Sequence, residues 1–190
     1  MRKFLTLFSA SYKELRSIRC ITLVAMLGAI SIVLGIYFTF LPVETMKISF
    51  TFLPNEFVYY LFGPVVGAVY GAALDILNFI VKPTGPYFYG FTVSAVLTGL
   101  LYGTMLYNKP LSLKRIIAAK MVHMVTINIL LNTYWLTMLY GNGFFAILPL
   151  RILKAVIMLP VEVFLLYSLI KAVEATGVLK GFHNSKTRIS

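Results

Sequence analysis

Long apolar runs, each ended by a short polar or proline-containing stretch, make up most of the chain. The breaks read "LP" at 41–42, "GP" at 63–64, "KPTGP" at 82–86, "NKP" at 108–110 and "YGNG" at 140–143. This pattern predicts helices over about 19–40, 54–62, 64–81, 87–107, 112–139 and 145–173. Apolar runs of about 18 residues are typical of transmembrane helices. We therefore expect an all-α integral membrane protein, a six-transmembrane-helix bundle in which the short helix at 54–62 counts as a crossing.

The stretch "KISFTFLP" departs from the helical pattern. Ile48, Phe50 and Phe52 alternate there with Ser49 and Thr51, and a period of two is typical of an extended chain. We expect a short extended segment in the first outer loop.

Residues 1–18 carry apolar side chains at helical spacing among basic ones, which predicts an amphipathic helix on the cytoplasmic membrane surface. Three parts follow: an amphipathic cytoplasmic N-terminal segment (1–18), a six-helix membrane domain (19–175) and a polar, basic C-terminal tail (176–190).

Composition agrees with a membrane protein. Of 190 residues, 59% are hydrophobic and 12% are charged, whereas soluble domains carry about 25% charged residues. The net charge is +11, and 13 of the 17 basic residues fall in three groups. They comprise Arg2, Lys3, Lys13, Arg16 and Arg19; Lys109, Lys114, Arg115 and Lys120; and Lys171, Lys180, Lys186 and Arg188. This spacing follows the positive-inside rule, and with six crossings it places both termini in the cytoplasm. It also favours contact with anionic membrane lipid over contact with nucleic acid.

Enzyme signatures are lacking in the sequence. There is no nucleophile elbow, no zinc-binding HExxH and no glycine-rich phosphate loop. The single cysteine, Cys20, excludes an internal disulfide, and we expect no metal or cofactor site. A small membrane-embedded transferase stays open as an alternative, although it would need metal-binding carboxylates and the chain has only six acids. A channel-like or standalone carrier protein is a third alternative.

Charged residues at membrane depth are the strongest functional signal, because each costs about 2.5–3.5 kcal/mol to insert. At about 1.5 Å per residue, Arg151 and Lys154 lie roughly 9 and 13 Å inside the outer end of the last helix. Asp75 and Asn78 lie in the outer half of the helix at 64–81, and Asn132 and Trp135 in that of the helix at 112–139. We expect these six residues to meet in one outward-facing pocket. A structural ion pair between Arg151 and Asp75, or snorkelling of the two cations, would be the alternatives.

Aromatic side chains are frequent at the same level. An interfacial aromatic belt accounts for many of them, but Trp135 lies nearly two turns inside its helix. Cations, amides and aromatic faces together suggest an anionic ligand with a flat ring. The aromatic candidates are Phe50, Phe52, Tyr59, Tyr87, Phe88, Tyr89, Tyr134, Trp135, Tyr140 and Phe144.

Small residues recur every four positions in two helices. Gly63, Gly67 and Gly71 form one stripe, for which we expect packing inside the bundle. Ala25 and Ala29, in "AMLGA", form a second that either packs internally or receives a partner helix.

Several of these features resemble one family. "AMLGA", the short helix after an extended loop and "LFGPVVGAVYGAALDIL" resemble the substrate-binding (S) component of energy-coupling-factor (ECF) vitamin transporters. "NTYWLTMLYG" followed by "LPLRILKAVIMLPVE" is similar to the folate-specific S component. The resemblance implies a bacterial plasma-membrane protein that binds folate from outside and topples to deliver it. It also implies a transmembrane coupling subunit docked at Ala25 and Ala29, and two ATPase subunits that bind ATP in its place.

Folate can be matched to the predicted pocket in two orientations. In the first, Arg151 and Lys154 contact anionic or carbonyl groups, Asp75 or Asn78 bonds the pterin edge, and Trp135 stacks with a tyrosine. In the second, Lys47 or Lys82 meets the carboxylates and Arg151 meets the pterin. The full predicted site is Arg151, Lys154, Trp135, Asn132, Asp75, Asn78, Tyr87, Tyr140 and Lys47, with another anionic aromatic vitamin as the alternative ligand.

Overall fold

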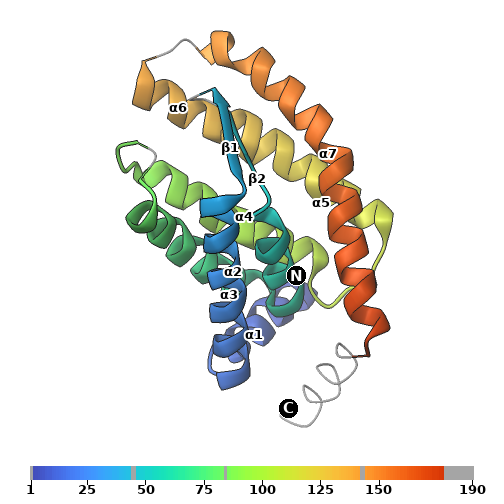
Figure 1. Cartoon of the computed structure of the whole chain (residues 1–190). Coiled ribbons are helices and arrows are strands. Elements are labelled where there is room, and N and C mark those ends of the chain that lie inside the picture. The colour runs from blue at the N-terminus through green and yellow to red at the C-terminus, as the bar shows by residue number, and fades with distance from the viewer. Residues whose placement is uncertain (1, 44–45, 84, 142–143, 178–190) are drawn as a thin grey trace.

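A computed structural model describes residues 2–43, 46–83, 85–141 and 144–177 (Figure 1). Its elements are α1 (Arg2–Glu14), α2 (Ile18–Tyr37), β1 (Thr39–Val43), β2 (Met46–Ser49), α3 (Phe52–Val81), α4 (Tyr89–Leu106), α5 (Leu113–His123), η1 (Met124–Leu131), α6 (Asn132–Tyr140) and α7 (Phe144–Ala175). The predicted tail lies outside the described residues from position 178 on.

Five of the described helical runs are long and apolar enough to cross a membrane. They are Ile18–Tyr37, Phe52–Val81, Tyr89–Leu106, Leu113–Leu139 and Leu148–Ala175. Large apolar side chains point outward along them, such as Met26 at 58% and Phe164 at 69% exposure. Apolar surface of this kind is stable in lipid. The expectation of an all-α membrane protein is confirmed.

The predicted extended segment is present as a two-stranded hairpin. Strands β1 and β2 pair antiparallel, with Thr39 opposite Ser49 and Phe40 opposite Ile48. The hairpin starts earlier than predicted, because the helix before it ends at Tyr37, and α3 begins at Phe52 instead of position 54.

Helix α3 is folded back on itself at Gly63. A straight helix would separate Asn55 from Tyr70 by roughly 22 Å, yet the Tyr70 hydroxyl donates to Asn55 Oδ1 at 2.8 Å. Gly63 has φ 84° and ψ −167°, a backbone conformation that glycine adopts without strain. Pro64 then starts the second arm, as proline does well at a first helical turn. The arms 52–62 and 64–81 therefore run antiparallel, as the predicted break at "GP" indicated.

Helix α1 is attached to this reversal by one buried side chain. The Ser11 hydroxyl donates to the Phe62 carbonyl at 2.7 Å and accepts from the amides of Val65 and Val66 at 3.0 and 3.2 Å. These backbone groups lose their helical partners where the chain turns, so Ser11 satisfies them. The predicted N-terminal helix is present, and this polar anchor to the bundle was not predicted.

The second arm of α3 packs backbone to backbone against α4. A Cβ atom added to Gly99 would lie 2.2 Å from the Gly67 carbonyl oxygen, and one added to Gly71 would lie 2.6 Å from that of Ala95. Side chains larger than hydrogen are excluded there. The prediction that the stripe 63/67/71 packs inside the bundle is confirmed.

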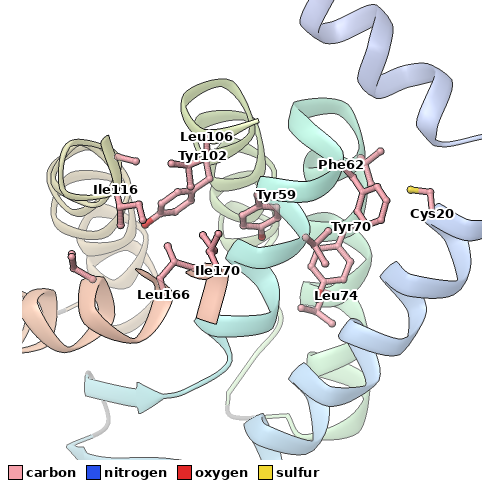
Figure 2. Close-up of a cluster of buried hydrophobic side chains, with 14 residues drawn as sticks. Cys20, Tyr59, Phe62, Tyr70, Leu74, Tyr102, Leu106, Ile116, Leu166 and Ile170 are labelled. Carbon is pink, nitrogen blue, oxygen red and sulfur yellow. The ribbon is translucent and has the colours of Figure 1, made fainter. Parts of the chain in front are cut away.

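Buried aromatic rings hold the two arms of α3 to the other helices (Figure 2). The Tyr59 ring stacks on that of Tyr102 with centroids 6.1 Å apart. Ile116 of α5 and Leu166 of α7 are fully buried beside them. This core lies towards the end of the molecule that holds Gly63 and the end of α4.

The run from α5 to α6 is one long helix, as predicted, but its centre is π-helical. Residues Met124–Leu131 adopt the wider i→i+5 pattern, which is rare and is often found at functional sites. Asn128 lies in the middle of this segment.

Candidate functional site

Arg151 is the centre of the candidate site. It lies in α7, its side chain is half-buried, and its Nη2 donates to Asn128 Oδ1 in η1 at 2.9 Å. Among the described residues no carboxylate lies within ion-pair distance of Arg151, so the alternative of an Arg151–Asp75 ion pair is not formed. A guanidinium beside a neutral amide keeps its charge available for an anion.

Trp135 forms an aromatic group at the start of α4. Its Nε1 donates to Ser94 Oγ at 3.2 Å, and its ring lies 5.6 Å from that of Phe88 and 5.2 Å from that of Tyr134. A Cβ atom at Gly90 would lie 2.7 Å from the indole, so glycine is what permits this approach. The group provides flat surfaces and one polar edge.

Asp75 and Tyr87 belong to a separate hydrogen-bonded group. Thr92 Oγ1 donates to Asp75 Oδ2 at 2.7 Å and shares a 2.7 Å hydrogen bond with the Tyr87 hydroxyl. Thr92 and Ser94 are two positions apart in α4, so they point roughly 200° apart. Asp75 with Tyr87 and Trp135 therefore lie against opposite faces of α4, which the single predicted pocket did not anticipate.

The other predicted residues have varied surroundings. Asn78 faces α2, where its Oδ1 lies 3.6 Å from the position of a Cβ atom on Gly35. Asn132 Oδ1 is buried with no hydrogen-bond partner in the described part of the chain. Lys154 is half-buried. The side chains of Lys47 and Tyr140 lie outside the described part of the structure.

A buried cluster of three charged residues lies further along α7. Lys120 of α5, 2% exposed, contacts Glu56 of α3 at 2.6 Å and Glu162 of α7 at 2.8 Å. The Phe52 ring centroid lies 4.5 Å from its ammonium. Lys120 was grouped with the basic cytoplasmic loop in the sequence, and the structure corrects this, because it lies two turns inside α5. The signal in the sequence that could have located it is that Glu56 and Glu162 lie within apolar helical runs, where a carboxylate needs a cation.

These groups supply the chemistry that an elongated ligand with an anionic end and a flat ring requires. Arg151 offers a cation, Trp135 and Phe88 offer aromatic faces, and the buried amide of Asn132 offers an acceptor. The sequence did not identify Asn128, Ser94 or the Lys120 cluster as parts of a site. Their roles arise from contacts between helices that are far apart in the sequence.

Residues 19–170 match the family model described as "ECF transporter, substrate-specific component". The chain belongs to this family. As an S component it is a multi-pass protein of the bacterial plasma membrane, and the family resemblance predicted from the sequence is confirmed.

Two relatives and one solved structure refine the comparison. The chain is 35% identical over 154 residues to the "Folate transporter FolT" of Clostridium novyi (strain NT), covering 80% of this chain and 90% of that protein. It is 30% identical over 160 residues to the "Folate transporter FolT" of Leuconostoc mesenteroides subsp. mesenteroides, covering 80% and 84%. A structure titled "Crystal structure of FolT bound with folic acid" is 34% identical, with a TM-score of 0.75, covering 80% of this chain and 93% of that one.

The alanine pair of this S component lies on the outer surface of α2. Ala25 and Ala29 are exposed, whereas Gly28 between them is buried and faces Tyr70 and Leu74 of α3. Within the described structure the pair does not pack internally, so a flat strip of α2 is open to lipid or to another helix.

Proposed function

We propose that this S component binds folate from the outside and delivers it to the cytoplasm within an ATP-driven ECF transporter. The observation that carries the proposal is the half-buried Arg151, which is held by a neutral amide inside a membrane helix. A half-buried cation at membrane depth without an acidic partner in the described chain is costly unless it serves a ligand. Similarity to FolT bound with folic acid supports folate as that ligand.

The proposed site places the anionic or carbonyl groups of folate at Arg151 and Lys154. Trp135, with Phe88 beside it, would stack on a ring, and Asn132 would bond a ring edge. Asp75, Asn78, Tyr87, Tyr140 and Lys47 remain predicted members of the site.

We propose six crossings with both termini in the cytoplasm. The reversal at Gly63 supports counting 52–62 as a separate crossing, and Ser11 attaches the basic N-terminal helix to that same turn. The turn lies beside the end of α4, since a Cβ atom on Gly103 would lie 2.4 Å from the Pro64 nitrogen. In the loop that follows, partial burial and the neighbouring Arg115 lower the pKa of Lys109. The first two basic groups therefore lie near the same end of the bundle, which supports a cytoplasmic side there under the positive-inside rule.

Partner subunits complete the proposed transporter. A transmembrane coupling subunit would dock on the exposed strip at Ala25 and Ala29, and two ATPase subunits would bind and hydrolyse ATP. The S component itself would carry out no catalysis and would topple in the membrane with its ligand.

The decisive experiment is calorimetric titration of the purified protein with folate in detergent, without ATP. We expect sub-micromolar binding of folate. Riboflavin and thiamine, which lack a dianionic group, serve as controls and should not bind. Absence of folate binding at micromolar concentrations would contradict the proposal, and binding of a control instead would reassign the ligand.

A further inference from the structure

The corner between α1 and α2 carries a group of exposed cations. We call Lys13, Arg16 and Arg19 the corner cations, and all three side chains are exposed. The guanidinium carbon of Arg16 lies 5.7 Å from the centroid of the Tyr12 ring, one turn earlier in the chain. Among the described residues no carboxylate lies within ion-pair distance of any corner cation. That part of the chain therefore leaves the three charges open to a partner from outside.

The corner is held in one shape by its backbone and by the core of the bundle. The Ser17 amide donates to the Glu14 carbonyl at 2.9 Å, which closes the turn between the two helices. Ser11 before the turn and Cys20 after it are both buried, at 0% and 2% exposure. Both sides of the turn are thus fixed to the bundle, and the corner cations are presented on a preformed surface.

Exposed apolar side chains lie among the corner cations. Tyr12 is 54% exposed, Ile18 81% and Ile21 56%. Cations mixed with apolar and aromatic side chains are typical of a membrane–water interface, where the apolar groups enter the lipid and the cations meet anionic headgroups. An acidic protein segment would match the charges and leave the isoleucines uncovered. The chemistry of the corner therefore fits an anionic phospholipid.

The exposed face of α2 runs from this corner to the alanine pair. Ile18, Ala25 and Ala29 are spaced by seven and four residues, so they share one face of the helix, and all three are exposed. From Arg19 to Ala29 the helix rises about 15 Å. One leaflet is half of a hydrocarbon core that is about 30 Å thick. The acyl chains of a lipid held at the corner are therefore long enough to reach the alanine pair.

We propose that the corner cations bind the phosphate of one anionic phospholipid, and that the acyl chains of this lipid cover Ala25 and Ala29. In the free S component the lipid occupies the exposed strip of α2, and a coupling subunit that docks there displaces it. The displacement, and the assignment of the lipid to the cytoplasmic leaflet, rest on the proposed function. Binding of the lipid itself depends only on the corner and on the face of α2.

The first experiment titrates the purified protein with phosphatidylglycerol in a neutral detergent, without folate, and counts bound lipids by native mass spectrometry. Phosphatidylcholine with the same acyl chains is the comparison, and we expect it to bind more weakly. Arg16→Gln should weaken phosphatidylglycerol binding about fivefold, because each cation near a lipid surface contributes a similar increment. Replacing Lys13, Arg16 and Arg19 together by Gln should weaken it about a hundredfold.

Lys171→Gln is the matched control for Arg16→Gln. Lys171 is also exposed and also lies over a tyrosine ring one turn earlier, that of Tyr167 at 5.9 Å, but it belongs to α7. We expect this variant to bind phosphatidylglycerol as the wild type does. Equal melting temperatures of the variants and the wild type check that all of them are folded.

The second experiment locates the acyl chains. A bimane fluorophore is attached to Ala29→Cys or to Val93→Cys, each in a Cys20→Ala background, and phosphatidylglycerol with brominated acyl chains is the quencher. Val93 is an exposed residue of α4. We expect quenching at position 29 to reach half of its maximum at a lower lipid concentration than at position 93.

Four results would overturn the proposal. They are equal affinity for the two lipids, wild-type affinity in the triple variant, a loss in Lys171→Gln as large as in Arg16→Gln, and equal quenching at positions 29 and 93. Glycerol 1-phosphate that binds as tightly as phosphatidylglycerol would also overturn it, because the corner would then be a site for soluble phosphate. Folate plays no part in either experiment, so failure of the lipid site would leave the proposed function intact, and failure of folate binding would leave the lipid site intact.

Discussion

Arg151 illustrates how a single side chain can combine stability with binding. Its hydrogen bond to Asn128 orients the guanidinium at 2.9 Å, but the amide does not neutralise it. An acidic residue in place of Asn128 would have made a stronger pair and left less charge for a ligand. The neutral partner is therefore the feature that suits a binding role.

Replacing Arg151 by Gln should weaken folate binding at least tenfold, because a charge-assisted contact to the ligand is worth about 1.5–3 kcal/mol. Calorimetry on the purified variant measures this. Arg115→Gln is the matched control, since the Arg115 side chain is half-buried, as that of Arg151 is, and donates to the Pro110 carbonyl. Equal affinity of Arg151→Gln and wild type would make Arg151 a structural residue.

The companion variant is Asn128→Asp, which places a carboxylate against the guanidinium. We expect it to weaken folate binding while the protein stays as stable as the wild type, because the pair within the protein is strengthened. Tighter folate binding in Asn128→Asp would argue against an anionic ligand group at Arg151.

At the scale of elements, glycine decides where helices touch. The backbones of α3 and α4 meet at Gly67 and Gly99, and no side chain can be added there without moving one helix. The sequence stripe at 63, 67 and 71 predicted this on α3, because its period of four is visible in one helix. The partner on α4 was not predicted, since choosing it requires knowing which helices are neighbours.

Gly99→Leu should destabilise the protein by about 1–3 kcal/mol or more, as overpacking does. The melting temperature of the solubilised protein measures the loss. Gly28→Ala serves as the control, because an added Cβ atom would make only an ordinary contact of 3.4 Å with Tyr70. Unchanged melting in Gly99→Leu would mean that α3 and α4 are further apart than described.

The hydrogen bonds of Ser11 hold α1 against the reversal in α3. Ser11→Ala leaves the Phe62 carbonyl and two amides without their partner, which should cost about 1–3 kcal/mol. Thermal melting checks this, together with proteolysis of α1, which should become faster. Ser9→Ala, at an exposed position of the same helix, should match the wild type in both measurements.

At the scale of the whole molecule, the order of the helices could be predicted from the sequence, and most of their ends lie within a few residues of the expected positions. Apolar runs and prolines are local signals, so the positions of the helices can be predicted from them without knowledge of the fold. The ion cluster at Lys120, the π-helical segment around Asn128 and the separation of Asp75 from Trp135 all depend on how distant helices pack. From the sequence, Lys120 was assigned to the basic cytoplasmic loop, whereas in the structure its side chain is buried inside the bundle.

The exposed strip on α2 yields a prediction for the assembled transporter. Ala29→Leu adds bulk to a surface that touches no other described element, so folate affinity and melting temperature should match the wild type. ATP-dependent folate uptake in cells should fall at least tenfold, because close helix contact with the coupling subunit would be blocked. Val93→Leu, at an exposed position of α4 away from this strip, is the control for added bulk. Lost folate binding in Ala29→Leu would show that the strip supports the site instead.

The glycine contact between α3 and α4 also has a consequence for flexibility, because α5 to α7 do not pack in this way. Where two backbones are in direct contact, no side chain lies between them that could change its rotamer. We therefore expect α3 and α4 to behave as one rigid unit. Helices α5 to α7 contain no glycine from 113 to 140 or from 144 to 175, and α5 and α7 bury side chains such as Ile116 and Leu166. We therefore expect amide hydrogen exchange to be slower along the contact between α3 and α4 than along α5 to α7.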